Sequence, residues 1–482
     1  MIDLKRAKLD KIINWAINVP FHPADVSNRA IDALFMQSSQ GNDAVMRSLS
    51  HFAWEMYHGN QLKYLVPNPA ETEADFQRRQ GKGFLNLTRL LVNVLASLYK
   101  NAPTRNIEAS ERLRKRAEQL YDGAKVDNVM LTADRYAKLA GSCAIRPVFY
   151  QGQILYHVFP AHSFRVQTMP EKPWQPSVLA TYHDLDDGNG GAKVQIIRVW
   201  TDQHFLQLEN KKPTKFIKHD IGRLPFTFVR DYNQPTGFWI QPQGAEIAYQ
   251  NRRINTKLSD LAYTVKMQGF GVLEVVNPDP SQEIVIAPNR AIQFRVMDNE
   301  PYGINFKHPN APIADIIEDI KFDIEQMLLT YRIPESAITV HLSKASSGVA
   351  IVAAQTPLHE ILQERANLFR MYETDLLDCT LRVLAKSDKS MEEQTRREIN
   401  ARKYSLRVDF PKPELNLSHA DKLADLEFKL KHNLITPWKL MYQENPDGFA
   451  DENAAMEQYF SNLKTLRMAN TQKSANSKDK SE

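Results

Sequence analysis

The sequence contains little of what marks a secreted or membrane-spanning protein. Only two cysteines, Cys143 and Cys379, occur among 482 residues, and each stands beside apolar or small residues. This usage favours reduced, buried thiols over a disulfide or a metal site. No run of about 18 apolar residues is present, and charges interrupt the apolar positions of the N-terminal segment. We therefore expect no membrane partner and a cytoplasmic protein.

Sequence patterns of catalysis and metal binding are also absent. No G-x-x-x-x-G-K-[ST] loop occurs, which argues against a motor ATPase, and the 13 histidines lack H-E-x-x-H spacing. The segment 184–190 faintly resembles a calcium loop, but Gln195 stands at the twelfth position, where an acid is needed, and Gly is not at the sixth. A polar hairpin tip explains the same residues and is favoured. Residues 346–348 lack the G-x-S-x-G context of a nucleophile and favour a turn. The sequence predicts no enzyme, no catalytic residue, no metal and no cofactor.

The composition is that of a globular protein with a sizeable core. Hydrophobic residues make up 43% of the chain and charged residues 24%, which is ordinary for folded domains. The formal net charge is only +4. A dedicated duplex-binding domain carries a much stronger basic excess, so any nucleic-acid partner would be held weakly.

Hydrophobic periodicity predicts an α+β fold in which helical and strand-rich segments are separated along the chain. Residues 1–140 are mostly helical, and short strands joined by turns fill 144–230, with a hairpin turn at 188–191. Farther on we expect the following elements: a helix at 244–268, a small β unit at 270–312, a helix at 313–331, a long helix at 348–386 kinked near Pro357, a strand at 404–410, and helices at 418–432 and 452–466.

The two helices that flank the small β unit carry faces of opposite charge. The helix at 313–331 has apolar residues at steps of three and four, and five acids oppose two basic residues between 313 and 332. The helix from Ala245 is also amphipathic, and Arg252 and Arg253 lie on its polar side. An ordinary solvated helix face explains either helix alone. Together, the opposite charges predict that a basic helix pairs with an acidic one.

Short signatures occur in a fixed order over residues 30–466. They include a Tyr-x-Gly turn, a helix that ends before Pro103, a Gly-Ser-Cys-Ala step before the β-rich part, a Pro before the first flanking helix, and a passage through Ser-Ser-Gly before the long helix. They stand at 55–61, 86–103, 141–146, 224–226 and 333–350, with a further turn at 433–438. Their shared order resembles the portal protein family of tailed bacteriophages, in which the step at 141 is similar to a Gly-x-Ala entry.

The resemblance implies a homo-oligomeric ring, expected to be a dodecamer, at the unique capsid vertex of the virion. Such a head-tail connector conducts double-stranded DNA during packaging and ejection. The implied partners are the terminase large subunit, the head-completion adaptor protein, and the major capsid and scaffolding proteins. The ring would assemble in the host cytoplasm.

The resemblance also divides the chain into the parts of a portal. The expected parts are the wing at 1–243, stem helix 1 at 244–269, the clip at 270–312, stem helix 2 at 313–332, the tunnel loop at 333–347, a kinked wing helix and strand at 348–417, crown helices at 418–467, and a disordered tail at 468–482.

Two groups of candidate site residues follow from this division. Residues of the tunnel loop, together with Arg332 at its root, would touch DNA weakly. These are Arg332, His341, Ser343, Lys344, Ser346 and Ser347. Residues of the stem would line the channel or join subunits, the basic helix of one subunit facing the acidic helix of the next. These are Arg252, Arg253, Asp260, Asp315, Glu318, Asp319, Ile320, Asp323 and Ile324. For Lys344, a solvated side chain without a DNA contact is an open alternative.

Two other classes of protein compete with the portal. Another phage structural protein, such as a connector adaptor or a minor capsid protein, would also lack catalytic motifs. It does not explain a small β unit held between two amphipathic helices. A DNA-processing enzyme would need clustered acids for a metal ion or a nucleotide-binding loop, and the sequence has neither in recognisable form.

Overall fold

The computed structural model describes residues 42–67, 71–78, 84–169, 171–185, 194–210, 212–269, 272–276, 303–307, 312–334, 348–411, 419–432, 434–445, 448–449 and 451–478. The chain divides into two compact units. Unit 1 contains 1–339 and 357–413, and unit 2 contains 340–356 and 414–482. The helix that begins at Gly348 belongs to both, and the division falls at its Pro357.

Helices open the described part of unit 1. They begin and end as follows: α3 Asn42–Tyr57, η2 Leu62–Tyr64, α4 Glu73–Arg78, α5 Leu87–Leu95, η3 Leu98–Lys100, α6 Glu111–Ala124 and α7 Val126–Ala140, with strand β1 (Thr104–Glu108) before α6. Side-chain caps fix two of these starts. Asn86 accepts a hydrogen bond from the backbone N–H of Arg89 at α5, and Ser110 accepts one from Leu113 at α6.

Two antiparallel sheets follow. Their strands are β2 Ser142–Tyr150, β3 Gln153–Pro160, β4 Phe164–Met169, β5 Lys172–Leu185, β6 Val194–Trp200, β7 His204–Glu209, β8 Lys212–Lys218 and β9 Thr227–Arg230, with the short η4 (Ala161–Ser163) between β3 and β4. One sheet has the order β3-β2-β9, and the other is a meander, β4-β5-β6-β7-β8. Aromatic side chains, among them Phe164, Trp200 and Phe226, form the buried cluster associated with these sheets.

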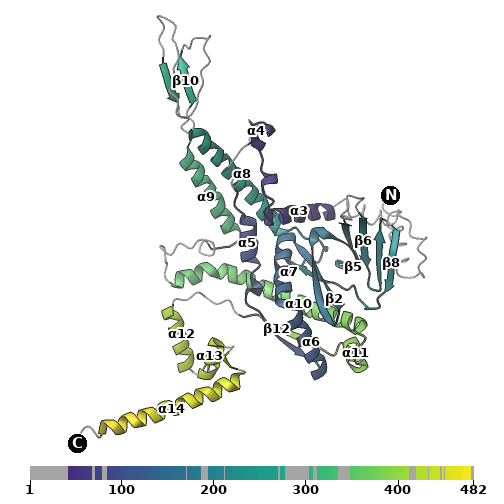
Figure 1. Cartoon of the computed structure of the whole chain (residues 1–482), viewed down its shortest axis with the longest axis vertical. Helices are drawn as coiled ribbons and strands as arrows, with labels where there is room; N and C mark the ends of the chain where they lie inside the picture. Colours follow the sequence, from purple (N-terminus) through teal and green to yellow (C-terminus); the bar gives the residue numbers. More distant parts are fainter. Residues whose placement is uncertain are drawn as a thin grey trace. The chain divides into compact units, whose positions relative to one another are not determined.

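The rest of unit 1 consists mainly of long helices. Its elements are α8 Gln243–Gly269, β10 Val272–Val276, β11 Gly303–Lys307, α9 Ile313–Thr330, α10 Gly348–Ser387 from Pro357 onward, α11 Glu393–Asn400 and β12 Ser405–Asp409. β10 pairs with β11, and β12 returns to pair with β1. Figure 1 shows α8 and α9 side by side, with β10 beyond their far ends.

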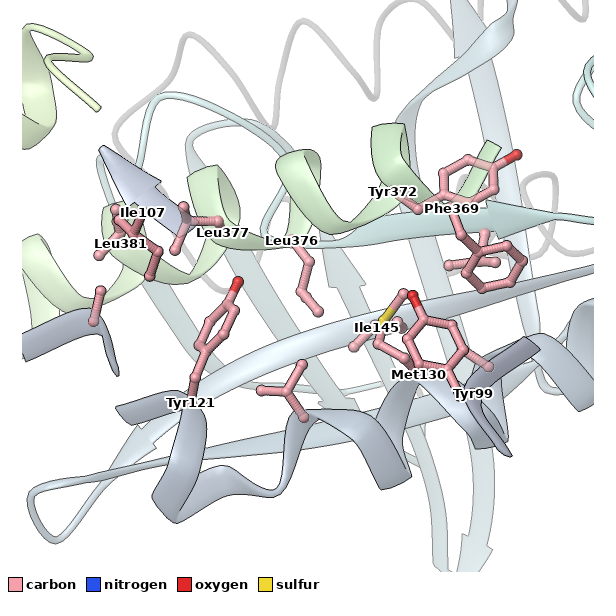
Figure 2. Packing of buried hydrophobic residues seen from close by; sticks show 14 of the residues in the cluster. Tyr99, Ile107, Tyr121, Met130, Ile145, Phe369, Tyr372, Leu376, Leu377 and Leu381 are labelled. Carbon is pink, nitrogen blue, oxygen red and sulfur yellow. The ribbon is translucent and has the colours of Figure 1, made fainter. Parts of the chain in front are cut away.

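The largest core lies where α10 packs on α6, α7 and β2. Figure 2 shows Phe369 and Leu376 of α10 pointing toward Tyr99, Tyr121 and Met130. Leu376 and Met130 are fully buried. The last 31 residues of α10 thus complete a core most of whose other members lie between Tyr99 and Ile145, more than 200 residues earlier in the sequence.

A buried network of four charged side chains crosses the same region. Arg365 of α10 binds Asp134 of α7 and Asp231 after β9, and Lys138 Nζ lies 2.8 Å from Asp231 Oδ1. Lys138 Nζ also donates to Gln243 Oε1 over 3.0 Å, at the start of α8. Burial alone would raise the pKa of Asp231, but Lys138 and Arg365 outweigh it and hold that pKa below its usual value. The network therefore joins α7, α10 and the root of α8.

Unit 2 contains the start of α10 and three further helices. These are α12 His419–Lys431, α13 Pro437–Glu444 and α14 Glu452–Lys478. Trp438 of α13 packs on Tyr459 and Phe460 of α14, with ring centroids 6.1 and 5.8 Å apart. Pro437 occupies the first helical position, where its missing N–H costs nothing.

Many of the elements expected from the sequence are confirmed, and the α+β class is correct. The helices at 244–268 and 313–331 and the strand at 404–410 match α8, α9 and β12 within about a residue. The expected tail at 468–482 was wrong in part, because α14 continues to Lys478. That stretch contains Ala, Gln and Lys but no Pro or Gly, so its helix propensity is adequate despite its polarity. The strands expected within 277–300 lie outside the described residues.

Candidate functional site

The most distinctive assembly of charged and exposed residues lies on the helical pair α8 and α9. α8 has 27 residues and α9 has 18. At 1.5 Å per residue these helices are about 40 and about 27 Å long. β10 directly follows α8, and β11 precedes α9, so the pair carries a two-stranded β unit at its far end.

Ion pairs join the polar edges of the two helices. Arg253 Nη2 lies 2.6 Å from Asp323 Oδ1, and Lys257 Nζ lies 2.7 Å from Asp323 Oδ2. Lys257 also binds Asp319. Burial alone would lower the pKa of Lys257, but Asp319 and Asp323 raise it above its ordinary value. The predicted pairing of a basic with an acidic helix thus occurs within one chain.

Two buried asparagines, one helical turn apart, hold the root of α8. Asn251 Oδ1 accepts hydrogen bonds from the backbone N–H and the hydroxyl of Thr88, over 3.0 and 2.9 Å, and its Nδ2 donates to Leu85 O. Asn255 Oδ1 accepts from the Leu85 N–H over 2.9 Å, and its Nδ2 donates to Gln61. Both side chains are fully buried, so these bonds are costly to lose and fix α8 on the start of α5.

The outward face of α9 combines exposed apolar side chains with acids. Phe322 is 57% exposed and Leu329 is 71% exposed, and their spacing of seven residues puts them on one side of the helix. Exposed Glu318 and Glu325 flank them. Beside Phe322 a groove of about 240 Å³ opens between the helices, and it is lined by Gln250, Arg253, Ile254, Phe322, Asp323, Gln326, Met327 and Thr330. Large exposed apolar side chains beside a groove are typical of interaction surfaces.

The predicted stem residues divide between the inside and the outside of this pair. Asp315, Glu318 and Asp319 are exposed on α9, while Asp260 of α8 is half-buried. Arg252 stacks on Tyr249, with its guanidinium 5.2 Å from the ring centroid.

The assignment of Ile320 to an intersubunit surface needs correction. Ile320 is 5% exposed and belongs to the chain's own core with Ala248, Ile254 and Met327, and Ile324 packs against that core. The apolar stripe of α9 is therefore used to pack on α8 of the same chain. The sequence pattern showed that the stripe is buried, but not on which chain.

The predicted tunnel-loop residues fall mostly outside the described residues. His341, Ser343, Lys344, Ser346 and Ser347 all belong to that group. Arg332 is described: it is exposed, and its φ of 54° places it in the left-handed region directly after α9. Arg332 N–H donates to Leu329 O over 3.1 Å, which closes the helix end.

Sequence reasoning missed Asn251, Asn255, Phe322 and Leu329. An Asn pair spaced by four on an otherwise apolar side of α8 was a visible signal, because buried amides need specific partners. Phe322 and Leu329 stand outside the regular apolar stripe of α9, which was the available sign of a second contact surface.

The described part of the chain has neither a metal-binding cluster nor a membrane-spanning helix. No group of three or more His, Cys, Asp or Glu side chains could hold a metal ion there. No helix within those ranges is long and apolar enough to cross a membrane. Comparison of the sequence with models of known protein families and with curated proteins gave no match. The function is therefore inferred from the residues of this chain.

Proposed function

We propose that this protein is the portal of a tailed bacteriophage, a ring at the unique capsid vertex through which double-stranded DNA is packaged and ejected. In this proposal α8 and α9 are the stem, the unit with β10 and β11 is the clip, and the helices expected at 418–467 are the crown. The clip would dock the terminase large subunit and later the head-completion adaptor. The protein acts as a conduit and carries out no chemical reaction.

The order of elements along the chain supports the proposal. A helical and β-rich body leads into one long helix, a two-stranded β unit, a second helix, and a 40-residue helix that returns to the body. Ion pairs lock the two stem helices to each other, and the two asparagines lock α8 to the body. This construction gives a stiff projection, which a ring of repeated subunits needs at its centre.

The single observation that carries the proposal is the outward face of α9. Phe322 and Leu329 are exposed on one side of α9 next to the groove, and the acids beside them give this face a negative charge. The outward side of α8 bears Tyr249 and Arg252 instead. Faces of opposite character on two neighbouring helices suit a heterologous contact, in which each copy binds the next and the set closes into a ring.

The proposal is tested by the mass of the purified native particle, measured by native mass spectrometry and followed by negative-stain imaging. A closed ring of about a dozen chains of 55.3 kDa with a central hole is expected. The variant Phe322→Asp with Leu329→Asp should fall apart into single chains and keep the helical content of the wild type. A ring that survives both substitutions would remove α9 from the interface.

A matched control is available on α10. Met371 is 59% exposed, close to the value for Phe322, and it also lies on a helix. Met371→Asp should leave the particle mass unchanged. A wild-type chain that stays monomeric at high concentration and moderate salt contradicts the ring and favours an adaptor or a minor capsid protein.

A further inference from the structure

Two arginines without acidic partners lie between the two sheets of unit 1. Arg146 on β2 stands opposite His157 on β3, and Arg198 on β6 stands opposite both Thr181 on β5 and Gln207 on β7. Trp200 lies two residues beyond Arg198, on the same face of the sheet. The Arg146 guanidinium lies 4.8 Å from the Trp200 ring centroid, so Trp200 brings the two sheets together at this point.

These two guanidiniums act on each other and on two histidines. Burial lowers the pKa of Arg146 to about 10, and the charge of Arg198 adds to that effect. Burial and the same arginines lower the pKa of His157, and burial and Arg198 lower the pKa of His183. Among the described residues neither arginine forms an ion pair. Arg198 Nε donates to Gln207 Oε1 over 3.1 Å, and the amide of Gln207 in turn donates to Glu209.

Three other buried arginines of this protein, in contrast, form ion pairs with carboxylates. Arg105 binds Glu373 and Asp127, Arg223 binds Asp375 and Asp378, and Arg365 binds Asp134 and Asp231. The pKa of each of these three arginines is raised by its carboxylates. Burying a charge without a partner is costly, so the pair at Arg146 and Arg198 calls for a compensating anion.

Buried donors at the same place also have no partner. Arg146 Nε, Trp200 Nε1 and Thr181 Oγ1 are all buried, and none forms a hydrogen bond with the residues that the structure describes. Thr181 is the cross-strand neighbour of Arg198, and Trp200 touches Arg146, so the three atoms belong to one location. An unpaired buried donor destabilises the folded state. All three are donors that still have a hydrogen bond to make.

We propose that Arg146, Arg198 and Trp200 form a binding site for an oxyanion of the phosphate type. Guanidinium groups bind such anions through paired N–H donors. Two of them on separate sheets, with an indole N–H and a hydroxyl, reach several sides of the ligand, which suits a tetrahedral anion with at least three free oxygens. A charge of about −2 on phosphate offsets both arginines. The site does not depend on ring formation or on the proposed function.

The first test measures thermal unfolding of the full chain in sodium phosphate against sodium chloride at equal ionic strength. Phosphate should raise Tm in a saturable way, because a ligand that binds only the folded state stabilises it. Arg146→Gln and Arg198→Gln should each abolish this increase, while Lys218→Gln, an exposed cation on the same sheet at β8, should retain it. A wild-type response equal in both salts, or a full response in Arg198→Gln, overturns the site.

The same experiment separates anion binding by Arg198 from a purely structural role, because the two predict different Tm values for Arg198→Gln without phosphate. Without phosphate, Arg198→Gln removes a repulsive neighbour of Arg146, so its Tm should equal or exceed that of the wild type. A much lower Tm would assign Arg198 to packing and contradict the proposal. If either variant fails to fold, calorimetric titration of phosphate into the wild type decides, because the site requires saturable binding of about one anion per chain.

Two sources can supply a phosphate group, and competition separates them. A nucleoside monophosphate and a duplex DNA of about 20 base pairs are each added to protein saturated with inorganic phosphate. Displacement by the monophosphate alone identifies a small phosphate monoester, whose phosphate keeps three free oxygens, and retention of the inorganic phosphate against both competitors identifies free phosphate. Displacement by the duplex, whose internal phosphates have two free oxygens and one charge each, would overturn the assignment to a dianion with three free oxygens. Acetate that stabilises the protein as strongly as phosphate would overturn the assignment to a phosphate-type anion.

Discussion

Replacing Arg365 by Met tests whether the buried charge network holds unit 1 together. Arg365 is 3% exposed, and it binds two carboxylates, Asp134 and Asp231, of which Asp231 also forms an ion pair with Lys138. The variant leaves two acids facing one lysine, so the interior gains one uncompensated negative charge. Breaking a buried ion pair in this way costs about 3–5 kcal/mol. Met preserves most of the volume, so little of the loss comes from a cavity.

Urea unfolding followed by tryptophan fluorescence measures this loss as a lower midpoint at unchanged slope. The double variant Arg365→Met with Asp134→Leu removes one charge of each sign and leaves the Lys138–Asp231 pair intact. It should therefore be more stable than Arg365→Met alone. A cost below about 1 kcal/mol for the single variant, or a double variant that is less stable than the single one, would refute the charge-balance reasoning.

Three further predictions concern other parts of the chain. Burial lowers the pKa of His162 to about 4, with smaller effects of His51 and His58, so the unfolded chain binds the extra proton more readily. The stability that this residue contributes is complete above pH 6.5 and is lost as the pH falls toward 4. The loss is at most about 3 kcal/mol, and solvent screening of the half-buried ring reduces it. His162→Phe should therefore make the free energy of unfolding depend less on pH in this range. Asn251→Ala leaves the Thr88 donors unpaired and should cost about 1–3 kcal/mol by urea unfolding, whereas a neutral result would contradict the anchoring role. Lys344→Glu should spare the particle mass and lower DNA packaged per particle, and unchanged packaging would exclude Lys344 from DNA contact.

The helices that matter most for the proposed function were predictable from the sequence. In α8 and α9 the apolar residues recur at helical spacing over several turns, and Pro312 stands directly before α9. Elements with weak or unusual patterns were not placed individually within the helical and strand-rich segments. β8 contains three lysines and Pro213 and forms an edge of its sheet, where alternation need not be apolar. α6 is highly charged, and its buried side consists of Leu113, Ala117, Leu120 and Tyr121.

The candidate sites were less predictable than the elements, since they depend on partners far apart in sequence. Charge patterns showed that α8 and α9 have opposite signs, but not that Arg253 meets Asp323 of its own chain. Nothing near Asn251 in sequence indicates Thr88 as its partner, 163 residues away. Likewise, Arg146 and Arg198 gave no sign of forming a pair, because their proximity follows from the packing of two sheets through Trp200.

The pairing of β1 with β12 has a consequence for biosynthesis. Thr104 pairs with Asp409, and the core on which α6 and α7 depend is completed by Phe369, Leu376 and Leu381 of α10. At about 5–20 residues per second, a ribosome reaches β12 roughly 15–60 s after β1. During that interval the nascent chain presents an open strand edge and an uncovered apolar surface. Early helices should thus engage a chaperone until α10 emerges, and premature termination before residue 365 should yield aggregated protein.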